Sequence, residues 1–566
     1  MKTFPHTDAQ TMISTQHRQI STALLAVLVL GSGFAGSELS AQQKNERVLK
    51  KMTVKRSVKA IAKLAKDGFI PMDADVESNG RRAMLAVRMV KPETPLAWFG
   101  KFDLKESKFD SLAEEYEKKK YRLVWHQEYK IKDDVLHACI WHFDENFSQL
   151  SEAELKDKEK RPEPKPLGVV WKPGSRISAA GKGIPEFAAF EEQAVAFMRA
   201  NQMPALSVAV SLKGKMLYQR SFGYSDLKKK KSLKPDQPFR MGSLSRIITV
   251  IAALQLVDQG KLKIDQPVYP FLDVKPWKPA TVDERAKDIT VLHLLQETGG
   301  HDESLTIDPT LSPRTITSRM NLKEVVTPKQ MVEFMISQPL AYDPGEDTKE
   351  SAYGYFLLGQ VIAKASGKSY EEYVMQNIAK PLKLRSLTMS RTDPDKRTKN
   401  EVRHVQRSGH YHAKHGGKNA ETWVPLNEGG YKFEMMEATH GWMASPTDLL
   451  ALSTAIQADP SPILSAKSKV LMIEKPGYLL KKLGGAAKPF WKGCGMFCRK
   501  TDGGITFWRY TTVANCSAAL VCFSESGLSY CYMFNCQVAA GGGNPGTTFD
   551  KILKREAIAV KNKLLQ

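Results

Sequence analysis

A highly charged stretch with three prolines interrupts the chain and separates a short first part from a long second part. This stretch, SEAELKDKEKRPEPKPLG at residues 151–168, is typical of a hydrated and fairly extended linker. The chain has 566 residues, which is more than one hydrophobic core usually serves, so two or more domains are expected. We therefore assign residues 151–173 to a linker, residues 42–150 to a small first domain and residues 174–566 to a large second domain.

The N-terminus has the order of features found in secretory signal peptides. Basic residues precede a short apolar run, ALLAVLVLGSGFA at residues 23–35, and small residues with a cleavage position after Ala41 follow it. The sequence therefore predicts a signal peptide over residues 1–41 and a periplasmic or extracellular protein. Because the segment before the apolar run is unusually long, a translation start at Met12 is an alternative. No transmembrane segment is expected, since no other stretch reaches about 18 uninterrupted apolar residues.

The formal net charge of the chain is +22, and it is spread along the sequence rather than concentrated in one tail or helix. A protein of this charge attracts anionic polymers or membranes of the cell envelope over long range. Nucleic acid is the other anionic partner, but the chain has no zinc-finger spacing, aromatic RNA-binding signature or basic-zipper pattern, and export argues against it. We expect a peptide, ester or cell-envelope ligand and no nucleic acid.

Most of the cysteines lie near the C-terminal end of the chain. They are Cys494, Cys498, Cys516, Cys522, Cys531 and Cys536, whereas Cys139 stands alone. In an oxidising compartment this clustering predicts up to three disulfides, with the pairing left open. A zinc site is disfavoured because no two of these cysteines have the two-residue zinc-type spacing. Reduced cysteines in the core are the remaining alternative, since free cysteine behaves as a small hydrophobic residue.

The first domain contains a segment that repeats itself. Residues 63–90 can be laid over a stretch within residues 114–143 with an offset of 52 and no gap, so that Phe69 matches Tyr121 and Ala86 matches Ala138. Each copy predicts a helix followed by two strands joined by a turn. The unit resembles the small repeat found beside β-lactamase-like domains in polyglycine hydrolases and related proteins. Because one copy buries little surface, the two copies are expected to pack together as a small α+β domain.

Four segments of the second domain carry a recognisable set of motifs in one order. They are FRMGSLSRIITVIAALQLVDQGKLKIDQPV (239–268), ITVLHLLQETGG (289–300), PGEDTKESAYGYFLLGQVIAKASGKSYEEYV (344–374) and HGWMASPTDLLALSTAI (440–456). The set resembles serine β-lactamases, D-alanyl-D-alanine carboxypeptidases and related esterases over roughly residues 180–540. The resemblance implies an α+β, β-lactamase/transpeptidase-like fold. In this three-layer domain an antiparallel sheet from both ends of the domain is covered by helices, with a helical insertion between.

The resemblance also implies a catalytic serine whose usual helpers have been replaced. In the family a serine opens a helix, a lysine three residues later takes its proton, and a tyrosine shares the proton traffic. Here the nucleophile position is Ser243, but the lysine position is Arg246, which is permanently protonated and cannot accept a proton. The tyrosine position is Glu350, and the asparagine position two residues later is Ala352.

The strand that borders the pocket in the family is the least similar of the motifs. It aligns with FWRYTTVANCSAAL, residues 507–520, where Arg509, Tyr510 and Thr511 stand in place of Lys/His-Thr-Gly. The resemblance implies that these three residues, together with Ala352, line the substrate side of the site.

The replacements of lysine and tyrosine can be explained together. Both groups lie beside the serine in the family, so Arg246 and Glu350 are predicted to form an ion pair under about 4 Å, which avoids a buried unpaired charge. This interpretation makes the protein a catalytically impaired binding or scaffold protein. The alternative is a divergent serine hydrolase in which Glu350 acts as the base toward Ser243, although pairing with a permanent cation weakens such a base.

No cofactor is expected, and only one segment raises the question of a metal. Four histidines crowd the segment HVQRSGHYHAKHGG, and imidazole suits zinc, copper and nickel. They are His404, His410, His412 and His415. No carboxylate or cysteine lies at a familiar ligand spacing from them, so an exposed loop is favoured over a metal site.

Overall fold

The structure is a computed structural model of the chain, and it describes most of the residues after the first 45. The described residues are 46–78, 82–91, 98–119, 121–132, 134–143, 168, 170–278, 282–302, 308–406, 412–414, 422–477, 490–501, 504–512, 516–537 and 545–565. The predicted signal peptide and most of the predicted linker lie outside them. None of the described helices is both long enough and apolar enough to cross a membrane. The chain divides into two compact units, Met1–Glu159 and Lys160–Gln566.

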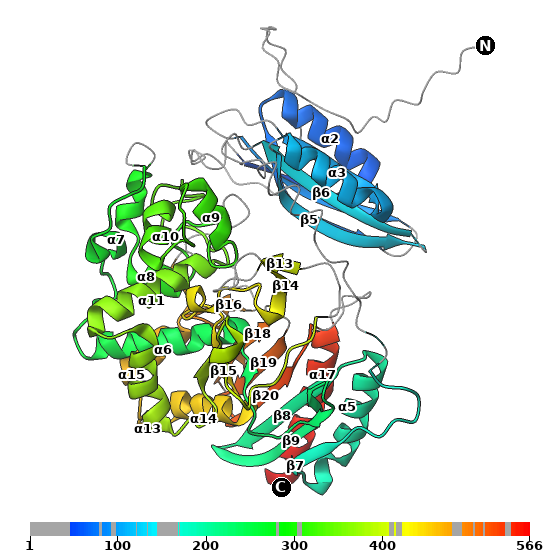
Figure 1. The fold of residues 1–566 in the computed structure, drawn as a ribbon, viewed down its shortest axis with the longest axis vertical. Coiled ribbons are helices and arrows are strands. Elements are labelled where there is room, and N and C mark those ends of the chain that lie inside the picture. The colour runs from blue at the N-terminus through cyan, green and yellow to red at the C-terminus, as the bar shows by residue number, and fades with distance from the viewer. Residues whose placement is uncertain are drawn as a thin grey trace, which may run out of the picture. The chain divides into compact units, whose positions relative to one another are not determined.

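The first unit consists of two copies of one strand–helix–strand–strand motif (Figure 1). Its elements are β1 (Glu46–Thr53), α2 (Val54–Lys66), β2 (Ile70–Ser78) and β3 (Ala83–Val90), followed by β4 (Trp98–Lys105), α3 (Glu106–Lys118), β5 (Tyr121–Ile131) and β6 (Asp134–Phe143). The first strands and the helices of the two copies begin 52 residues apart, and the second and third strands begin 51 residues apart. The predicted repeat is therefore confirmed, and each copy also has a first strand that the sequence did not predict.

The two copies share a hydrophobic core. Each forms a three-stranded antiparallel sheet, in the orders β1-β3-β2 and β4-β6-β5. One buried cluster contains Ile61 and Val87 from the first copy and Phe102 and Tyr129 from the second. The Gln127 side chain of the second copy also donates a hydrogen bond to the Val76 carbonyl of the first, at 2.8 Å. The copies thus pack together, as expected for units too small to bury a core alone.

The second unit is built on a nine-stranded antiparallel sheet formed by the two ends of the unit, as predicted. The N-terminal strands are β7 (Ala179–Lys182), β8 (Ala205–Leu212), β9 (Lys215–Asp226) and β10 (Lys231–Ser232). The C-terminal strands are β16 (Trp491–Lys492), β17 (Phe497–Thr501), β18 (Gly504–Thr511), β19 (Ser517–Phe523) and β20 (Leu528–Phe534). The order is β10-β9-β8-β20-β19-β18-β17-β16, with β7 paired to β9, so β8 and β20 join the two ends.

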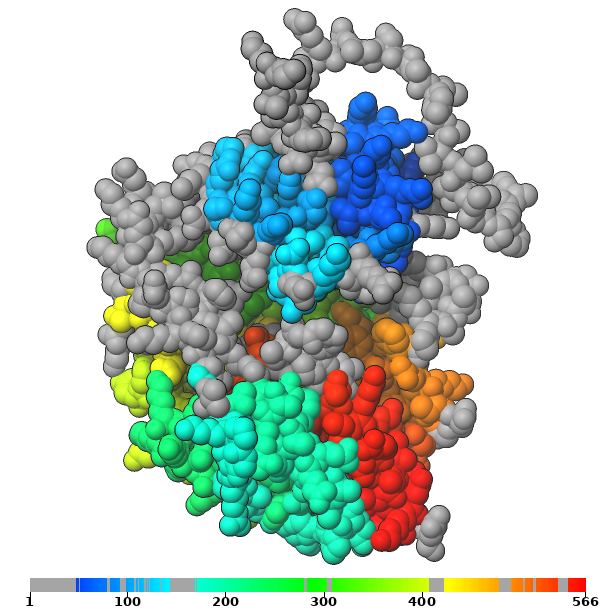
Figure 2. All heavy atoms as spheres, turned by 90° about the vertical axis from the view of Figure 1, so that its right-hand side faces the viewer, coloured from blue at the N-terminus to red at the C-terminus, as the bar shows by residue number. Residues whose placement is uncertain are grey.

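Helices cover both faces of this sheet. On one face lie α5 (Ala188–Ala200) and α17 (Pro545–Leu565), and on the other lie α6 (Ser245–Asp258) and α14 (Pro446–Gln457), with α11 (Ala352–Ser366) packed against α6. Alternate residues of β19 point to the two sides: Leu520 joins the cluster of α6, whereas Val521 joins that of α17. Figure 2 shows α17 in red on the outside of the unit, while α6 is apolar all round and lies at the centre.

The remaining elements form the helical insertion between β10 and β16, as expected from the family resemblance. They are β11 (Phe239–Arg240), α7 (Val268–Leu272), α8 (Val291–Leu295), α9 (Pro313–Arg319), α10 (Pro328–Met335), α12 (Tyr370–Val374), α13 (Lys380–Leu382), β12 (Thr388–Met389), β13 (His412–Lys414), β14 (Trp423–Pro425), β15 (Trp442–Ala444) and α15 (Ala466–Ile473). Strands β11, β15 and β12 form a small sheet. It fixes the chain just before Ser243.

The cysteines do not form the disulfides predicted from their clustering. All seven are buried free thiols. In the β-ladder Cys522 lies opposite Ser529, and Cys531 lies opposite Leu520, so these two cysteines are not directly paired. Burial raises the pKa of the Cys522 thiol to about 12, which keeps it protonated and unreactive. The alternative interpretation, reduced cysteines that pack as small hydrophobic residues, is the one that the structure supports.

Candidate active site

Ser243 lies in a tight turn directly before the central helix. A single 3₁₀ turn covers Gly242–Leu244, and α6 begins at Ser245. Gly242 has a φ of +50°, and a Cβ at this position would overlap the hydroxyl of Thr511 on β18. Glycine therefore meets two needs here, a left-handed backbone and a close approach to the neighbouring strand. As a result Ser243 is held against β18 and is only 4% exposed.

Among the described residues, strand β18 supplies the hydrogen-bond partners of the Ser243 hydroxyl and N–H. The Ser243 hydroxyl donates to the Tyr510 carbonyl at 3.1 Å and accepts from Arg509 Nε at 3.3 Å. The backbone N–H of Ser243 donates to Thr511 Oγ1 at 3.0 Å. The segment aligned with the third motif thus does lie beside Ser243, with Arg509 and Thr511 facing it.

Tyr510 contributes its backbone to this site but not its ring. Side chains alternate along a strand, so Tyr510 points to the opposite face of the sheet from Arg509 and Thr511. There its hydroxyl donates to Asp550 Oδ2 on α17 at 3.0 Å. The expectation that the Tyr510 side chain lines the substrate site is therefore wrong, because the side-chain period of a strand separates it from both its neighbours.

Arg246 is buried and binds two carboxylates. Its Nη1 donates to Glu350 Oε1 at 3.1 Å and to Glu297 Oε1 at 2.6 Å, and its side chain is 2% exposed. The predicted contact between Arg246 and Glu350 is therefore confirmed. The shorter bond, however, goes to Glu297, a residue that the sequence reasoning did not single out.

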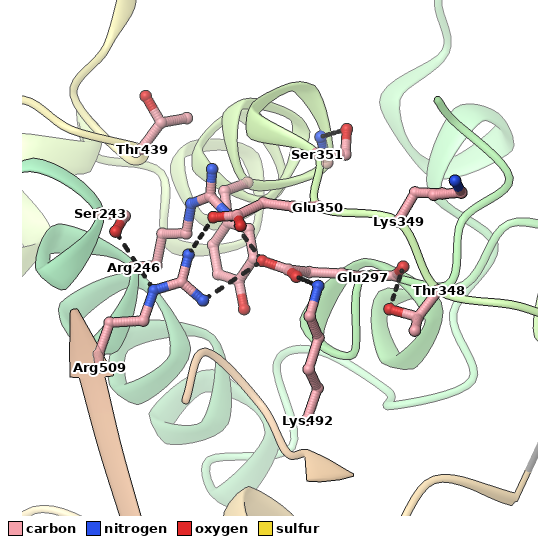
Figure 3. Close-up of polar contacts among 12 residues, drawn as sticks. Ser243, Arg246, Glu297, Thr348, Lys349, Glu350, Ser351, Thr439, Lys492 and Arg509 are labelled. Carbon is pink, nitrogen blue, oxygen red and sulfur yellow. Dashed lines mark hydrogen bonds and ion pairs between the residues drawn. The ribbon is translucent and has the colours of Figure 1, made fainter. Parts of the chain in front are cut away.

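Glu297 is the centre of the charge network (Figure 3). Its side chain is 3% exposed, and besides Arg246 it binds Lys492 Nζ at 2.7 Å and lies 3.6 Å from Arg509 Nη1. Burial alone would raise the pKa of the Glu297 carboxyl, but the charges of Lys492, Arg509 and Arg246 together lower it to about 2. Three cations thus hold one buried carboxylate in its ionised form.

This lowered pKa predicts how the stability of the protein depends on pH. The Glu297 carboxyl has an ordinary pKa of 4.5 when unpaired, so its contribution is complete above that pH and is lost as the pH falls toward 2. The difference corresponds to about 3 kcal/mol. We expect the free energy of unfolding to fall more steeply between pH 5 and pH 2, by about this amount, in the wild type than in Glu297→Gln. Denaturant unfolding measured at several pH values tests this, and equal slopes would contradict it.

Glu350 closes the network on its solvent side. Arg509 Nη2 donates to Glu350 Oε1 at 2.6 Å, and the Glu350 side chain is 52% exposed. Three cations, Arg246, Arg509 and Lys492, therefore bind these two carboxylates beside Ser243, and the Asp308 carboxyl also interacts electrostatically with Arg246. Figure 3 shows Arg509 between the Ser243 hydroxyl and the two glutamates, so this guanidinium connects the serine to the network.

Ala352 is the first residue of α11. The helix is capped by Ser351, whose hydroxyl accepts a hydrogen bond from the Gly354 N–H. Glu350 precedes this cap, so its carboxylate lies near the positive end of the helix dipole. Ala352 itself is 1% exposed and has no polar side-chain atom, so it offers a ligand nothing of what the asparagine of the family offers.

Comparison with known protein families decides the classification. The profile of the family described as beta-lactamase matches residues 187–551, well over half of the chain. The chain belongs to the β-lactamase family. A second profile, described as the polyglycine hydrolase-like structural repeat, matches residues 95–144, which is the second copy of the small repeat.

The β-lactamase-family relatives of this chain are distant. Protein flp of Staphylococcus aureus (strain MW2) is 25% identical over 196 residues, which is 35% of this chain and 37% of the relative. Penicillin-binding protein 4* of Bacillus subtilis (strain 168) is 26% identical over 170 residues, 30% of this chain and 34% of the relative. The chain thus matches about a third of the length of these relatives.

Solved structures of similar fold are equally distant in sequence. One is the octameric penicillin-binding protein homologue from Pyrococcus abyssi, with a TM-score of 0.48 and 21% identity, covering 66% of this chain and 77% of that one. Another is EstCE1, a hydrolase with promiscuous acyltransferase activity, with a TM-score of 0.49 and 18% identity, covering 65% of this chain and 97% of that one. At these identities the likeness concerns the fold alone.

One further residue of this β-lactamase-family site was not singled out from the sequence. His440 is buried, and burial together with the charges of Arg246 and Arg509 lowers its pKa well below the usual range. The imidazole is therefore neutral, and its Nδ1 is hydrogen-bonded to Thr439 Oγ1 at 3.0 Å. His440 begins the fourth of the matched segments, which is the only signal by which it could have been found.

The histidine-rich segment of this family member only partly fits the expectation of an exposed loop. His404 is 5% exposed, and its Nδ1 donates to the Val402 carbonyl at 3.1 Å, so this histidine belongs to the interior. His412 lies on β13, whereas His410 and His415 lie outside the described residues. Among the residues that the structure describes, no group of three or more His, Cys, Asp or Glu side chains is placed to hold a metal ion.

Proposed function

We propose that this member of the β-lactamase family is exported and binds a ligand at the cell envelope without hydrolysing it. The observation that carries the proposal is the set of hydrogen bonds around Ser243. Its hydroxyl is bonded to a guanidinium that cannot accept a proton and to a backbone carbonyl. Within the described part of the chain, no carboxylate, imidazole or amine is hydrogen-bonded to this hydroxyl, so no group is placed to activate it.

The backbone around Ser243 supports the same proposal. A serine hydrolase needs free N–H groups to stabilise the negative charge that develops on the substrate oxygen. Here the N–H of Ser243 is already bonded to Thr511 Oγ1, so it is not available to a substrate. The low exposure of Ser243, 4%, further restricts the approach of an acyl group.

The proposals for the ligand and for the location of the protein rest on properties of the whole chain. The apolar run at residues 23–35 and the net charge of +22 favour an exported protein that meets anionic envelope polymers. By its name, the Bacillus subtilis relative binds penicillin, which makes peptide-like or ester-like acyl compounds the first ligands to test. Nucleic acid is not proposed as a partner.

A divergent serine hydrolase is the second candidate, and one contact favours it. Arg509 bonds both the Ser243 hydroxyl and the Glu350 carboxylate, so a small shift of this guanidinium would bring Glu350 toward the serine as a base. Two arginines are hydrogen-bonded to Glu350 Oε1, however, and no hydrogen bond among the described residues joins this carboxylate to Ser243.

Covalent labelling of the full-length chain separates the two candidates. The protein is incubated with a fluorophosphonate or with a fluorescent penicillin, and intact mass is measured beside Ser243→Ala as the matched control. We expect no added mass on the wild type, and reversible binding of the fluorescent penicillin that is the same in both proteins by anisotropy. An adduct on the wild type that is absent from Ser243→Ala would overturn the non-hydrolytic proposal. Failure of both labelling and reversible binding would remove penicillin-like compounds as ligands.

A further inference from the structure

A pocket lies on the side of the sheet opposite Ser243. It has a volume of about 440 Å³ and is bordered by β17, β18, β19, β20 and α17. Tyr510 shows how the two sites relate, because its carbonyl accepts the bond from Ser243 while its ring lines this pocket. The volume is in the range of small-molecule sites and too small for a folded partner.

The floor of the pocket is apolar and aromatic. Trp508 on β18 and Val521 and Phe523 on β19 point to this face, and Ile558 of α17 forms the opposite wall. Helix α17 packs over β19 and β20, and no described helix continues over the outer face of β17 and β18. The pocket lies where this cover ends, and its floor combines the buried side chains of Val521 and Phe523 with the partly exposed Trp508, which favours an apolar occupant.

Cations surround this floor. Arg499 lies over the Trp508 ring at 5.7 Å, Lys554 lies over the Phe523 ring at 5.5 Å, and Lys561 follows two turns later on α17. In the part of the chain that the structure describes, none of these three side chains forms an ion pair. They contrast with Arg246 and Arg509, which each bind two carboxylates.

The acidic groups of the pocket only partly offset the charge of this rim. Both oxygens of Asp550 accept tyrosine hydroxyls, from Tyr510 at 3.0 Å and from Tyr530 at 2.9 Å, and Asp550 interacts with Lys554 electrostatically without forming an ion pair. Glu525 is the other acidic residue of the lining, and it lies in the exposed turn between β19 and β20. The pocket thus combines an apolar floor with an excess of positive charge at its edge.

We propose that this pocket binds a single-chain amphiphile with one anionic head group, of the fatty carboxylate class. The apolar chain lies in the pocket beside Trp508 and Phe523, whose ring faces are covered by Arg499 and Lys554, and these two cations bind the carboxylate. Charge complementarity selects an anion, since none of the three cations forms an ion pair with a described residue, and the apolar floor selects a chain over a small inorganic ion. The small volume selects a single chain over a peptide or a membrane surface.

Binding of laurate to the full-length protein tests the proposal. Isothermal titration is run below the micelle concentration with laurate, with dodecanol and with dodecyltrimethylammonium, which share the chain and differ in head-group charge. We expect saturable binding of laurate, weaker binding of dodecanol and none of the cation. Lys554→Glu is expected to weaken laurate binding about tenfold or more. Lys551→Glu, an exposed position on the same helix outside the pocket, makes the same charge change and is expected to bind as the wild type does.

A second variant separates the contribution of the apolar floor to laurate binding from the contribution of the cations. Trp508→Ala removes the floor and keeps all three cations, so laurate and dodecanol should both bind more weakly, by about the same factor. Equal unfolding midpoints for the wild type and each variant show that the fold is intact. Absence of saturable laurate binding, or equal affinity in Lys554→Glu and Lys551→Glu, would overturn the proposal, as would tighter binding of an acidic peptide than of laurate. These outcomes are independent of whether Ser243 reacts.

Discussion

Replacing Glu297 with glutamine is expected to lower the free energy of unfolding by about 3–5 kcal/mol. The substitution keeps the size of the side chain and removes its charge, which leaves Arg246, Arg509 and Lys492 close together, with Glu350 still hydrogen-bonded to the two arginines. Arg246 and Arg509 are each 2% exposed, so water cannot replace the lost carboxylate. Breaking one side of a buried ion pair is costly because it leaves the partner desolvated and unpaired.

Glu350→Gln is the matched control for this experiment. Glu350 binds the same two arginines, but its side chain is 52% exposed, and pairs of exposed charges contribute about 1 kcal/mol or less. Denaturant unfolding at neutral pH, followed by circular dichroism and fluorescence, measures both variants. If the two substitutions have equal effects, or if Glu350→Gln is the more harmful, Glu297 is not the centre of the network.

Substituting Gly242 with alanine is expected to destabilise the second unit by about 2–4 kcal/mol. Two costs add at this position. A left-handed backbone is unfavourable for alanine by about 1 kcal/mol, and the new methyl group would overlap the Thr511 hydroxyl that is bonded to the Ser243 N–H.

Gly260→Ala isolates the first of these costs. Gly260 also has a positive φ, +68°, but a Cβ there would have no atom within 4 Å. The excess effect of Gly242→Ala over Gly260→Ala therefore measures the overlap with Thr511. Thermal and denaturant unfolding of the two variants give this difference, and a difference near zero would show that β18 is not packed closely against the serine turn.

Much of the fold could be predicted because its signals are local. The four motifs occur in the order found in the family, and each can be recognised from residues that are close together in the sequence. The family fold, with a sheet from both ends of the domain and a helical insertion between them, could therefore be predicted. The first strands of the two repeats were missed. Strand β1, ERVLKKMT, has charged residues at four of its eight positions and lies at the edge of its sheet, where one side faces solvent and apolar alternation is weak.

Within the site, the only ion pair that could be predicted joins two positions that face each other in the family. Arg246 and Glu350 could be paired in this way, whereas Glu297 is 51 residues from Arg246 and 195 residues from Lys492. The chain has 83 Lys and Arg and 61 Asp and Glu residues, so charge alone does not distinguish the few that are buried. Only the folded chain brings such distant residues together. Tyr510, in contrast, could have been placed correctly from the alternation of side chains along a strand.

The constant 52-residue spacing of the small repeats bears on how the two copies have changed since they arose. One added residue in a helix would turn all later side chains by about 100°, and one in a strand would exchange its inner and outer faces. Either change would expose the shared core that neither copy can replace by itself. The first strands and the helices of the two copies still begin 52 residues apart, and the hairpin pairs Ser78–Ala83 and Lys130–Val135 keep the same offset. The copies have therefore diverged in these elements by substitution, and insertions or deletions were confined to positions where they left the period unchanged.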